Sequence, residues 1–591
     1  MNKKRHEDGS TDHKVLYGGK LKRRYTDWEN NVLAKRVGPD GQLRSEFKTR
    51  HGQVEKTKEV FRSGSGEFTI KSVYTPLDLM QTDPVEDIGF PGSFPFVRGR
   101  DPLGPQADVL PVKFYSGFGG GKDANERYKA LYAAGGNFFS IAFDLPTQLG
   151  YDSDSSQAKW EVGKVGVALD TLQDLEDLFE GLPLEDIRTG TVGNCIGPWA
   201  FALFYLLGQR RKVRPQDMKI VLQNDPIKEY TGRGTYIFSP QTAIDLASDV
   251  VVHICKHLPF GWQPQFHCTT QMRWGGCTAS QEIAFGIADL IAYVEAAQKK
   301  GVPPEDLIPR LDLHMTTDND LFEEVAKFRA ARRVWAKVLK KKFSTNDPRI
   351  LSLRLTVWTG SHRLTAQQPL NNIIRTTIHS LASMLGGVET ISVPAHDEAL
   401  ALPTTESTRL AAITPHILKE ECMVVNTADP LAGSYYVEDL TNRLEEKSLY
   451  WLAQVEKQGG AVACVENGYY LKRMSEEMLK YKQEIENNTR TVIGVNKFVV
   501  ANEKSMELFE GDPESEQRQI EKLAHIRQIR NKASVQKALD EIRNTAENKA
   551  SGKDENIVPA MLKAVDANAT VGEIFGILRE VFGEYRPPSI F

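Results

Sequence analysis

Short runs of β-branched and aromatic residues alternate with longer stretches of helical period along the middle of the chain. The helical stretches include residues 280–300 and 320–343, in which apolar positions recur on one face. The predicted strands are residues 111–118, 138–145, 188–194, 219–225, 265–272, 310–317, 351–358 and 388–395. Eight strands that alternate with helices predict an α/β fold, a (β/α)8 TIM barrel, with a doubly wound open sheet as the alternative.

The two ends of the chain differ from this middle part. Residues 1–75 are charged and irregular and are interpreted as an N-terminal polar arm. Residues 76–430 hold the barrel pattern, and residues 431–591 read as a helical extension rich in charged side chains. Near the end of that extension, Thr570 and Glu573 have the spacing of a capping box at a helix start.

Composition excludes several classes of function. The 591 residues carry a formal net charge of -4 without basic stripes, which argues against a nucleic-acid partner. The start of the chain lacks the apolar core of a signal peptide, and the longest apolar run, Trp199–Gly208, is too short to cross a membrane. Six dispersed cysteines without a CxxC pair favour buried thiols in a reducing, cytoplasmic setting.

The stretch "FYSGFGGGKDANERY", Phe114–Tyr128, raises the question of a phosphate-binding loop. A Walker loop ends in Gly-Lys-Ser/Thr, so that a hydroxyl binds magnesium. Here Lys122 is followed by Asp123, and Ser116 stands where the first glycine belongs. The spacing therefore excludes that loop, and the glycines need another explanation.

Polar residues at the strand ends should gather at the barrel mouth, because chemistry in this fold takes place at the carboxyl ends of the strands. The expected mouth residues are Tyr115, Asp144, Asn194, Gln223 to Asp225, Arg233, Gln271, Arg310 to His314, Trp358 and Asp397 to Glu398. They are hydrogen-bonding and cationic groups, without a Ser-His-Asp set or a metal-ligand cluster. Such a set suits chemistry in which a cofactor performs the hard step.

Two further motifs have simpler explanations. The histidines of "HICKH", His253–His257, have zinc-like spacing, but no third ligand accompanies them, so we expect a solvated helix end. The run "KFRAARRVW", Lys327–Trp335, is expected to be a solvent-exposed basic helix face.

Several long segments resemble one enzyme family. These are "FDLPTQLGYDSD", "QNDPIKEYTGRGTYIF", "EEVAKFRAARRVWA", "LTAQQPLNNIIRTTI", "DEALALPT" and "DPLAGSYYVE". They are similar to the substrate-binding barrel of coenzyme B12-dependent acyl-CoA mutases, the methylmalonyl-CoA mutase family. The resemblance runs from about Tyr74 to the C-terminus. It implies that the glycines of residues 114–128 turn the first strand into a helix at the active-site mouth.

The resemblance also implies an activity and partners. The family's members are isomerases that use adenosylcobalamin for a radical carbon-skeleton rearrangement of an acyl-CoA. The Asp-x-His-x-x-Gly motif that supplies cobalt's lower ligand is incomplete here, since the nearest match, Asp312–Thr317, lacks its glycine and lies on a predicted strand. We therefore expect a large subunit in a hetero-oligomer, with cobalamin bound mainly by a separate small subunit that docks on residues 431–591.

Carried over by resemblance, Tyr115 contacts the substrate carboxylate and helps to drive radical formation, and Arg233 pairs with that carboxylate. The further substrate contacts are Gln223, Ser140 and Arg310, and Glu398 lies near the adenosyl ribose. Because relatives acting on uncharged acyl groups replace the Tyr-Arg pair, its retention favours a carboxylated acyl group.

The sequence also departs from the family pattern. The loop that grips the CoA tail reads "LGPQAD" at residues 103–108, and the histidine that polarises the thioester carbonyl is replaced by Gln271, a neutral donor. Trp358 stands for a glutamine near the adenosyl group, while Thr270 and Gly193 create space. Two alternatives stay open: a radical mutase for a substrate without CoA or carboxylate, and a non-catalytic mutase-like partner protein.

Overall fold

The computed structural model describes residues 9–32, 34, 61–71, 73–104, 112–133, 135–503 and 506–587. Eight predicted strands are all present in it. They are β3 (Phe114–Ser116), β4 (Phe138–Ile141), β5 (Arg188–Val192), β6 (Lys219–Gln223), β8 (Gln265–Cys268), β9 (Leu311–Thr317), β10 (Leu355–Thr359) and β11 (Thr390–Ser392). A two-residue strand, β7 (Trp262–Gln263), precedes β8 and is separated from it by Pro264. A short antiparallel pair, β1 (Phe61–Arg62) and β2 (Thr69–Ile70), lies outside the barrel.

All barrel strands pair in parallel and in chain order. One sheet runs β3-β4-β5-β6-β7 and the other β8-β9-β10-β11. The ring is continuous between them because β7 and β8 are two parts of one chain segment interrupted at Pro264. Between the last and first strands, Val112 forms a bridge with Ile391, and the Lys113 amide donates to the Ile391 carbonyl at 3.0 Å. The fold is therefore the predicted (β/α)8 barrel.

The rings of Tyr115 and Trp358 show which side of the strands faces the interior. They meet edge to face with centroids 5.5 Å apart, although β11 lies between β3 and β10. Both rings therefore point into the barrel, and the strand registers extend that direction to their paired neighbours. We call the space enclosed by these inward side chains the lumen, and the end where the strands finish the mouth.

Inward and outward faces differ sharply in chemistry. The outward residues are mostly apolar and buried under helices: Phe139, Ile141, Ile220, Leu222, Leu313, Met315, Val357 and Ile391. The inward residues are mainly small or polar: Ser140, Gly190, Gln223, Cys268, His314, Thr356 and Ser392. Because bulky branched side chains usually fill such a barrel, this lumen is unusually polar.

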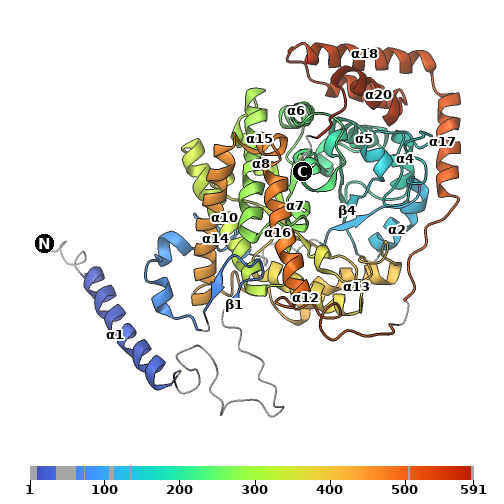
Figure 1. Cartoon of the computed structure of the whole chain (residues 1–591). Coiled ribbons are helices and arrows are strands. Elements are labelled where there is room, and N and C mark those ends of the chain that lie inside the picture. The colour runs from blue at the N-terminus through green and yellow to red at the C-terminus, as the bar shows by residue number, and fades with distance from the viewer. Residues whose placement is uncertain are drawn as a thin grey trace.

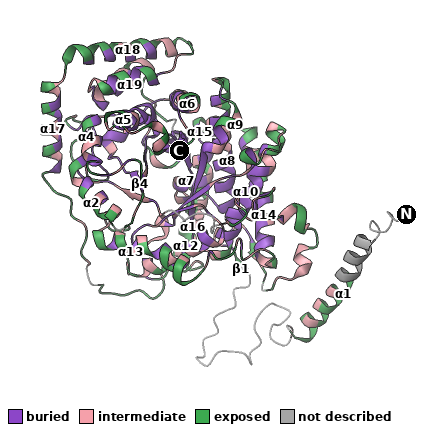
Figure 2. Cartoon of the chain, turned by 180° about the vertical axis from the view of Figure 1, so that it is seen from behind, coloured by how far each residue is buried: buried purple, intermediate pink, exposed green. Residues whose placement is uncertain are grey.

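Helices cover the outside of the ring (Figure 1). Those that follow the strands are α2 (Gly121–Ala133), α4 (Leu172–Leu178), α5 (Gly197–Arg210), α6 (Pro240–His257), α8 (Ala279–Lys299), α10 (Leu321–Phe343), α12 (Asn371–Leu385) and α13 (Thr405–His416). Shorter helices are α3 (Leu145–Gln148), α7 (Thr270–Trp274), α9 (Pro304–Leu307) and α11 (Pro348–Leu351), and α1 (Gly9–Asn31) stands near the N-terminus. Buried residues concentrate where these helices meet the strands (Figure 2).

The helical extension packs onto the barrel in two groups. The first group is α14 (Tyr435–Lys457), α15 (Ala461–Glu466) and α16 (Tyr469–Glu486), with α14 against α8 and α10. The second is α17 (Ser515–Ile529), α18 (Lys532–Ala550), α19 (Val558–Asp566) and α20 (Val571–Phe582). The apolar residues of α18, α19 and α20 join the core around α4 and α5. The capping box at Thr570 and Glu573 starts α20 as predicted.

Asp152, in the loop after β4, connects this second group to the mouth. Its carboxylate pairs with Arg527 of α17 at 2.6 Å. It also accepts hydrogen bonds from the Thr570 hydroxyl at 2.6 Å and the Gly572 amide at 2.7 Å, at the start of α20. One carboxylate thus holds two C-terminal helices against a loop of the mouth.

The expectation of an exposed basic face on α10 is wrong. Arg329, Arg332 and Arg333 are each at most 1% exposed. Arg329 pairs with Asp429 and Glu438 of the C-terminal region, and Arg332 donates to backbone carbonyls. The helix pattern could not show this, because the groups that cover that face come from distant segments of the chain.

No helix in the described ranges is sufficiently long and apolar to span a lipid bilayer. The six cysteines are free thiols, of which Cys195, Cys268, Cys277 and Cys464 are buried. The expectation of buried thiols therefore holds for these four, whereas Cys255 is half-buried and Cys422 is exposed.

Candidate functional site

Tyr115, Trp358 and Glu398 form one wall of the mouth. The Trp358 indole N–H donates to the Ser361 hydroxyl, in the turn that follows β10. Ser361 in turn makes a side-chain hydrogen bond to Glu398, in the loop after β11. Burial raises the pKa of the Glu398 carboxyl to about 7, against the opposing effect of the Ser361 hydrogen bond. The structure thus brings three of the sequence-predicted site residues into one connected set.

Arg233 stands on the opposite wall. It ends the π-helical turn Glu229–Arg233 that follows β6, an irregular turn of the kind that often marks functional sites. Its guanidinium Nη1 lies 3.6 Å from Glu229 Oε1. Burial alone would lower the pKa of Arg233, but Glu229 and two acidic groups of the lumen raise it. These two groups are Tyr115 and Cys268, so both lie within electrostatic range of the Arg233 guanidinium.

One buried carboxylate serves two cations at this wall. Glu229 is fully buried, and its Oε1 lies 3.1 Å from the Lys228 ammonium as well as 3.6 Å from Arg233. It also accepts hydrogen bonds from the side chains of Asn194 and Thr235. The wall therefore carries a surplus of positive charge, which favours an anionic ligand.

Gln271 lies between these walls, on α7 just after β8. Its Oε1 accepts from the Thr270 hydroxyl at 3.0 Å and from the Cys268 thiol at 3.3 Å. Because the oxygen is occupied by these donors, the amide N–H groups of Gln271 remain to bind a ligand. Neighbouring ionic contacts hold α7 in place, since Arg273 pairs with Asp318 at 3.3 Å.

Ser140 and Gln223, two further residues predicted for the site, also lie on the lumen side of their strands. Ser140 pairs in register with Tyr115, so its hydroxyl also faces the lumen. Gln223 ends β6 and is 6% exposed, and its side-chain amide makes no hydrogen bond to another described residue. Both are therefore placed to contact a bound molecule near Tyr115.

Arg310 does not join this group. It precedes β9 and donates through Nη1 to the Pro259 carbonyl at 3.0 Å, at the amino end of the barrel. Its expected place at the mouth is therefore wrong, because β9 finishes at Thr317. Arg310 instead lines a surface cavity of about 440 Å³. Three further arginines line that cavity: Arg100, Arg349 and Arg354.

Lys113 also lies in the lumen, although the sequence analysis did not predict it as a site residue. Lys113 lies two residues before Tyr115 on the same strand edge and is 8% exposed. Its ammonium lies 4.1 Å from the centre of the Phe266 ring. The sequence does show a lysine between apolar residues at the start of a strand. A strand pattern alone, however, does not show whether that lysine faces the lumen or the surrounding helices.

His267 is a second group that the sequence analysis missed. It faces outward between two carboxylates, with Nδ1 at 2.8 Å from Asp225 and Nε2 at 3.2 Å from Asp289. Although burial opposes the charge, these carboxylates raise the pKa of His267 to about 10. The Tyr293 and Tyr470 hydroxyls complete the network by donating to Asp225 and Asp289, so its polar groups serve the packing of β8.

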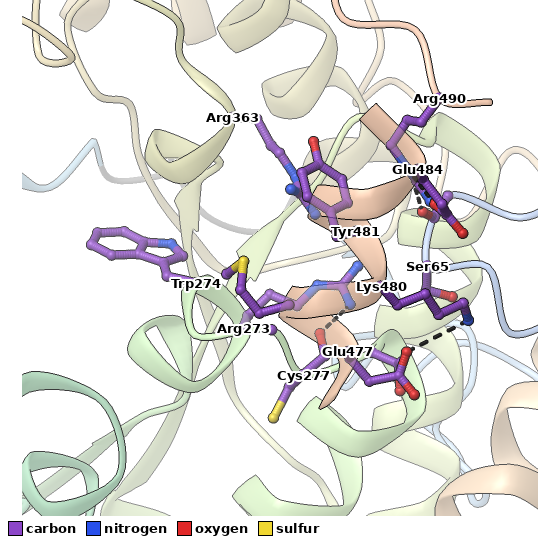
Figure 3. A pocket seen from close by; sticks show the side chains of 14 residues that line it. Ser65, Arg273, Trp274, Cys277, Arg363, Glu477, Lys480, Tyr481, Glu484 and Arg490 are labelled. Carbon is purple, nitrogen blue, oxygen red and sulfur yellow. Dashed lines mark hydrogen bonds and ion pairs between the residues drawn. The ribbon is translucent and has the colours of Figure 1, made fainter. Parts of the chain in front are cut away.

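A small cavity beside α7 contains many charged side chains (Figure 3). Its volume is about 30 Å³, enough for one water molecule. The Arg363 guanidinium lies 4.1 Å over the Tyr481 ring, and Arg490 pairs with Glu484 at 2.8 Å. Because these charges already have partners, the cavity is not a ligand site. Arg363, which lines it, pairs with Asp318 and so stabilises the turn that carries Ser361.

Among the described residues, no group of three or more His, Cys, Asp or Glu side chains is arranged to hold a metal ion. His253 and His257 lie on α6 with rings 4.9 Å apart, and the helix expected there is confirmed. The loop at residues 103–108 lies outside the described residues beyond Gly104.

The fold and the site define the class of protein: a (β/α)8 barrel enzyme with a polar lumen. The methylmalonyl-CoA mutase family model matches residues 63–584, and the chain belongs to that family. Members of this family depend on coenzyme B12 and are isomerases. The glycine-rich turn fits this placement, since Gly119 has φ +61° and α2 begins at Gly121.

Three relatives illustrate the similarity. The chain is 34% identical over 540 residues to the 2-hydroxyisobutanoyl-CoA mutase large subunit of Aquincola tertiaricarbonis, covering 91% of this chain and 95% of that protein. It is 35% identical over 544 residues to methylmalonyl-CoA mutase of Escherichia coli (strain K12), covering 90% and 74%. It is 34% identical over 524 residues to the mitochondrial methylmalonyl-CoA mutase of Homo sapiens, covering 88% and 68%.

Proposed function

We propose that this chain is the large subunit of an adenosylcobalamin-dependent mutase that rearranges a carboxylated acyl-CoA of the methylmalonyl or succinyl type, or a bulkier analogue. The observation that carries the proposal is the convergence of Tyr115 and Arg233 on one lumen with surplus positive charge. A phenol and a guanidinium together bind a carboxylate through two kinds of donor, and the guanidinium keeps its charge when buried.

The acyl group lies between these donors and the lumen wall. Ser140 and Gln223 present a hydroxyl and an amide with no described protein partner toward the same space. Gln271 offers its amide N–H to the thioester oxygen. The thioester tail then extends along the barrel axis toward the amino-end cavity, which four arginines and the carboxylates of Glu305 and Asp306 line.

The mouth also offers groups that fit the cofactor. Three buried polar atoms there lack partners among the described residues: Asp397 Oδ1, His396 Nδ1 and Trp274 Nε1. With the Trp358–Ser361–Glu398 set, they provide donors and acceptors for an adenosyl group and for the amides of a corrin. When bound, adenosylcobalamin supplies an adenosyl radical by homolysis of its cobalt–carbon bond.

The residues of the chain hold and shield the reacting groups. Glu398 binds the adenosyl ribose, Trp358 covers one side of the acyl group beside Tyr115, and the buried walls keep water away. No strong base is needed at the mouth, because the substrate hydrogen moves as an atom.

A cobalamin-binding small subunit is the proposed partner, in a hetero-oligomer. The relative from Aquincola tertiaricarbonis is named a large subunit, and the present chain covers 95% of it. Residues 431–591 remain the proposed docking region, since α17 and α20 lie beside the mouth loop that carries Asp152. The cytoplasmic location and the domain boundaries at residues 75 and 430 stay predictions.

An anaerobic assay with the small subunit, adenosylcobalamin and a set of acyl-CoA thioesters tests the proposal. We expect isomerisation of at least one malonyl- or succinyl-type thioester and no activity with an uncharged acyl-CoA. Arg233→Gln should lower kcat/KM for the carboxylated substrate by roughly 100-fold or more, because a buried charge pair is lost. Arg409→Gln, which removes an exposed arginine paired with Glu406, is the matched control and should leave kcat/KM unchanged.

Two results would contradict the proposal. Absence of turnover with every carboxylated thioester, while the radical signal forms, would point to a substrate without CoA. Absence of both turnover and cobalt–carbon homolysis in the assembled complex would favour a non-catalytic partner protein.

A further inference from the structure

Lys113 differs from the other buried lysines of the barrel. Lys228 lies 3.1 Å from Glu229, and Lys327 lies 2.7 Å from Glu282. Lys113 is 8% exposed, yet its ammonium makes no ion pair or hydrogen bond within the described parts of the chain. Its contacts are with the faces of Phe266 and Phe138, at 4.1 and 5.7 Å. A buried ammonium without a hydrogen-bond acceptor marks a position where a ligand supplies one.

The position of Lys113 relative to the carboxylate-binding pair is informative. Lys113 immediately precedes β3 and lies about 7 Å below Tyr115, since an extended chain rises about 3.3 Å per residue. Cys268, on β8, lies within electrostatic range of both Arg233 and Lys113. Both cations therefore face the lumen, so a ligand whose carboxylate pairs with Arg233 can present a second acceptor toward Lys113.

We propose that the Lys113 ammonium donates a hydrogen bond to the thioester carbonyl oxygen of the bound acyl-CoA. This inference rests on the proposed function and assigns to the chain a charged donor beside the neutral amide of Gln271. Cys268 lies beside Gln271, because its thiol donates to Gln271 Oε1 at 3.3 Å.

The physical reason is the charge on the carbonyl oxygen during migration of the acyl group. As the carbonyl carbon changes its bonding partner, electron density rises on the oxygen, and a preorganised cation stabilises that state. A charged donor is roughly twice as strong as a neutral one. The proton stays on the nitrogen throughout, so no base has to remove it and no proton has to return.

The surroundings of Lys113 make its charge sensitive to pH. Burial lowers the pKa of Lys113 to about 8, while Cys268 on β8 opposes the shift. The other charged or titratable groups that face it are Arg188 on β5, Asp312 and His314 on β9, and Lys228 after β6. The contribution of Lys113 should therefore be present below pH 8 and fade above it.

Infrared difference spectroscopy of the full chain with bound methylmalonyl-CoA and succinyl-CoA, isotopically labelled at the thioester carbonyl, tests the hydrogen bond without cofactor or turnover. We expect a carbonyl band at lower frequency in the bound than in the free thioester. Lys113→Met should remove most of that shift, and Lys113→Arg should retain part of it. Lys340→Met is the matched control, since Lys340 also lies over a phenyl ring, at 4.3 Å from Phe94, on the outside of the barrel.

Kinetics of the assembled enzyme give a second readout. Lys113→Met should lower kcat by about 10- to 100-fold with little change in KM, the effect of losing a charged hydrogen bond in the transition state. The loss of activity above pH 8 should disappear in the Lys113→Arg variant, because a guanidinium stays protonated.

Distinct results would overturn the inference. A carbonyl band that Lys113→Met leaves unchanged, a band that shifts only in His314→Phe, or an increase in KM without a fall in kcat would each assign the carbonyl donor elsewhere. If the wild-type chain turns over its thioester and Lys113→Met matches it, only this inference fails. If the wild-type chain binds none of the thioesters, the proposed function fails and the inference with it.

Discussion

Two sets of buried cations in this protein have opposite surroundings. On α10, outside the barrel, Arg329 is paired by two carboxylates, Asp429 and Glu438. In the lumen, Lys113 has no carboxylate partner among the described residues, and Arg233 shares its single carboxylate with a lysine. The charges of the first set are neutralised within the chain. Those of the second set are neutralised only when a ligand supplies an anion or a hydrogen-bond acceptor.

This difference distinguishes buried charges that stabilise the fold from buried charges that bind a ligand. A buried ion pair stabilises the fold only while both partners are present, because each charge has lost its water. A buried cation left without a partner destabilises the fold, and a ligand that pairs with it binds more strongly for that reason. The same distinction applies to carboxyl groups such as Glu398 at the mouth.

The largest expected effect is on the paired set. Arg329→Met should lower the free energy of unfolding by about 3–5 kcal/mol, because Glu438 loses its cation and Asp429 keeps only the more distant Arg98. Chemical denaturation of the purified chain measures it. The control is Arg409→Met, which removes an exposed pair with Glu406 and should leave the midpoint unchanged. Equal midpoints for both variants would show that the α10 arginines are not structural.

The His267 network extends the comparison to a titratable cation. Its pKa is about 10 in the folded chain and 6.5 ordinarily, so its stabilising effect is complete below pH 6.5 and is lost as pH rises to 10. His267→Gln should cost about 2–4 kcal/mol at pH 6. Melting temperatures across this range should show the gap to wild type closing toward pH 10. A gap independent of pH would mean that the imidazole is neutral.

The unpaired lumen lysine should behave in the opposite way. The pKa of Lys113 is depressed from 10.5 to about 8, so its charged form destabilises the fold, fully below pH 8 and not at all above 10.5. Lys113→Met should therefore raise the free energy of unfolding by about 1–2 kcal/mol at pH 7. The same denaturation experiment at pH 7 and 10.5 measures the gain and its disappearance. Destabilisation at pH 7 would place Lys113 with the structural cations.

The smallest effect concerns Glu398. Its carboxyl is raised to a pKa of about 7, so it is ionised above and protonated below that value. Because the ionised form accepts hydrogen bonds better, half-saturation by adenosylcobalamin with the small subunit should tighten by about 5-fold as pH rises through 7. Glu398→Gln should flatten this dependence. A wild-type profile without a step near pH 7 would remove Glu398 from the cofactor site.

The strands were predictable because their outward residues are apolar and their inward ones are small or polar, an alternation that the sequence shows directly. Position along a strand was harder to predict. The segment 310–317 was expected to place Arg310 at the mouth, whereas β9 starts at Leu311 and its mouth end is Thr317. The interruption at Pro264 was not predicted either. It divides the fifth strand into β7, which pairs with β6, and β8, which pairs with β9, but it does not alter the pattern of apolar residues.

Long-range partners account for the other misses. The pattern of α10 does not reveal that Asp429 and Glu438 return to cover its arginines, since those residues lie about a hundred positions away. Tyr115 and Arg233 were predicted from similarity to the family, and their shared orientation became visible only with the ring of strands. Lys113 was missed because a lone lysine has no distinctive local spacing.

The carboxylate of Asp152 has a consequence for how the protein can be divided. Since it fastens two late helices to a loop that forms early in the chain, a fragment ending before Ser515 would leave that loop without its anchors and uncover the apolar side of α5. Residues 515–582 are therefore an integral part of the fold, and transferring the barrel into another protein would require transferring them with it.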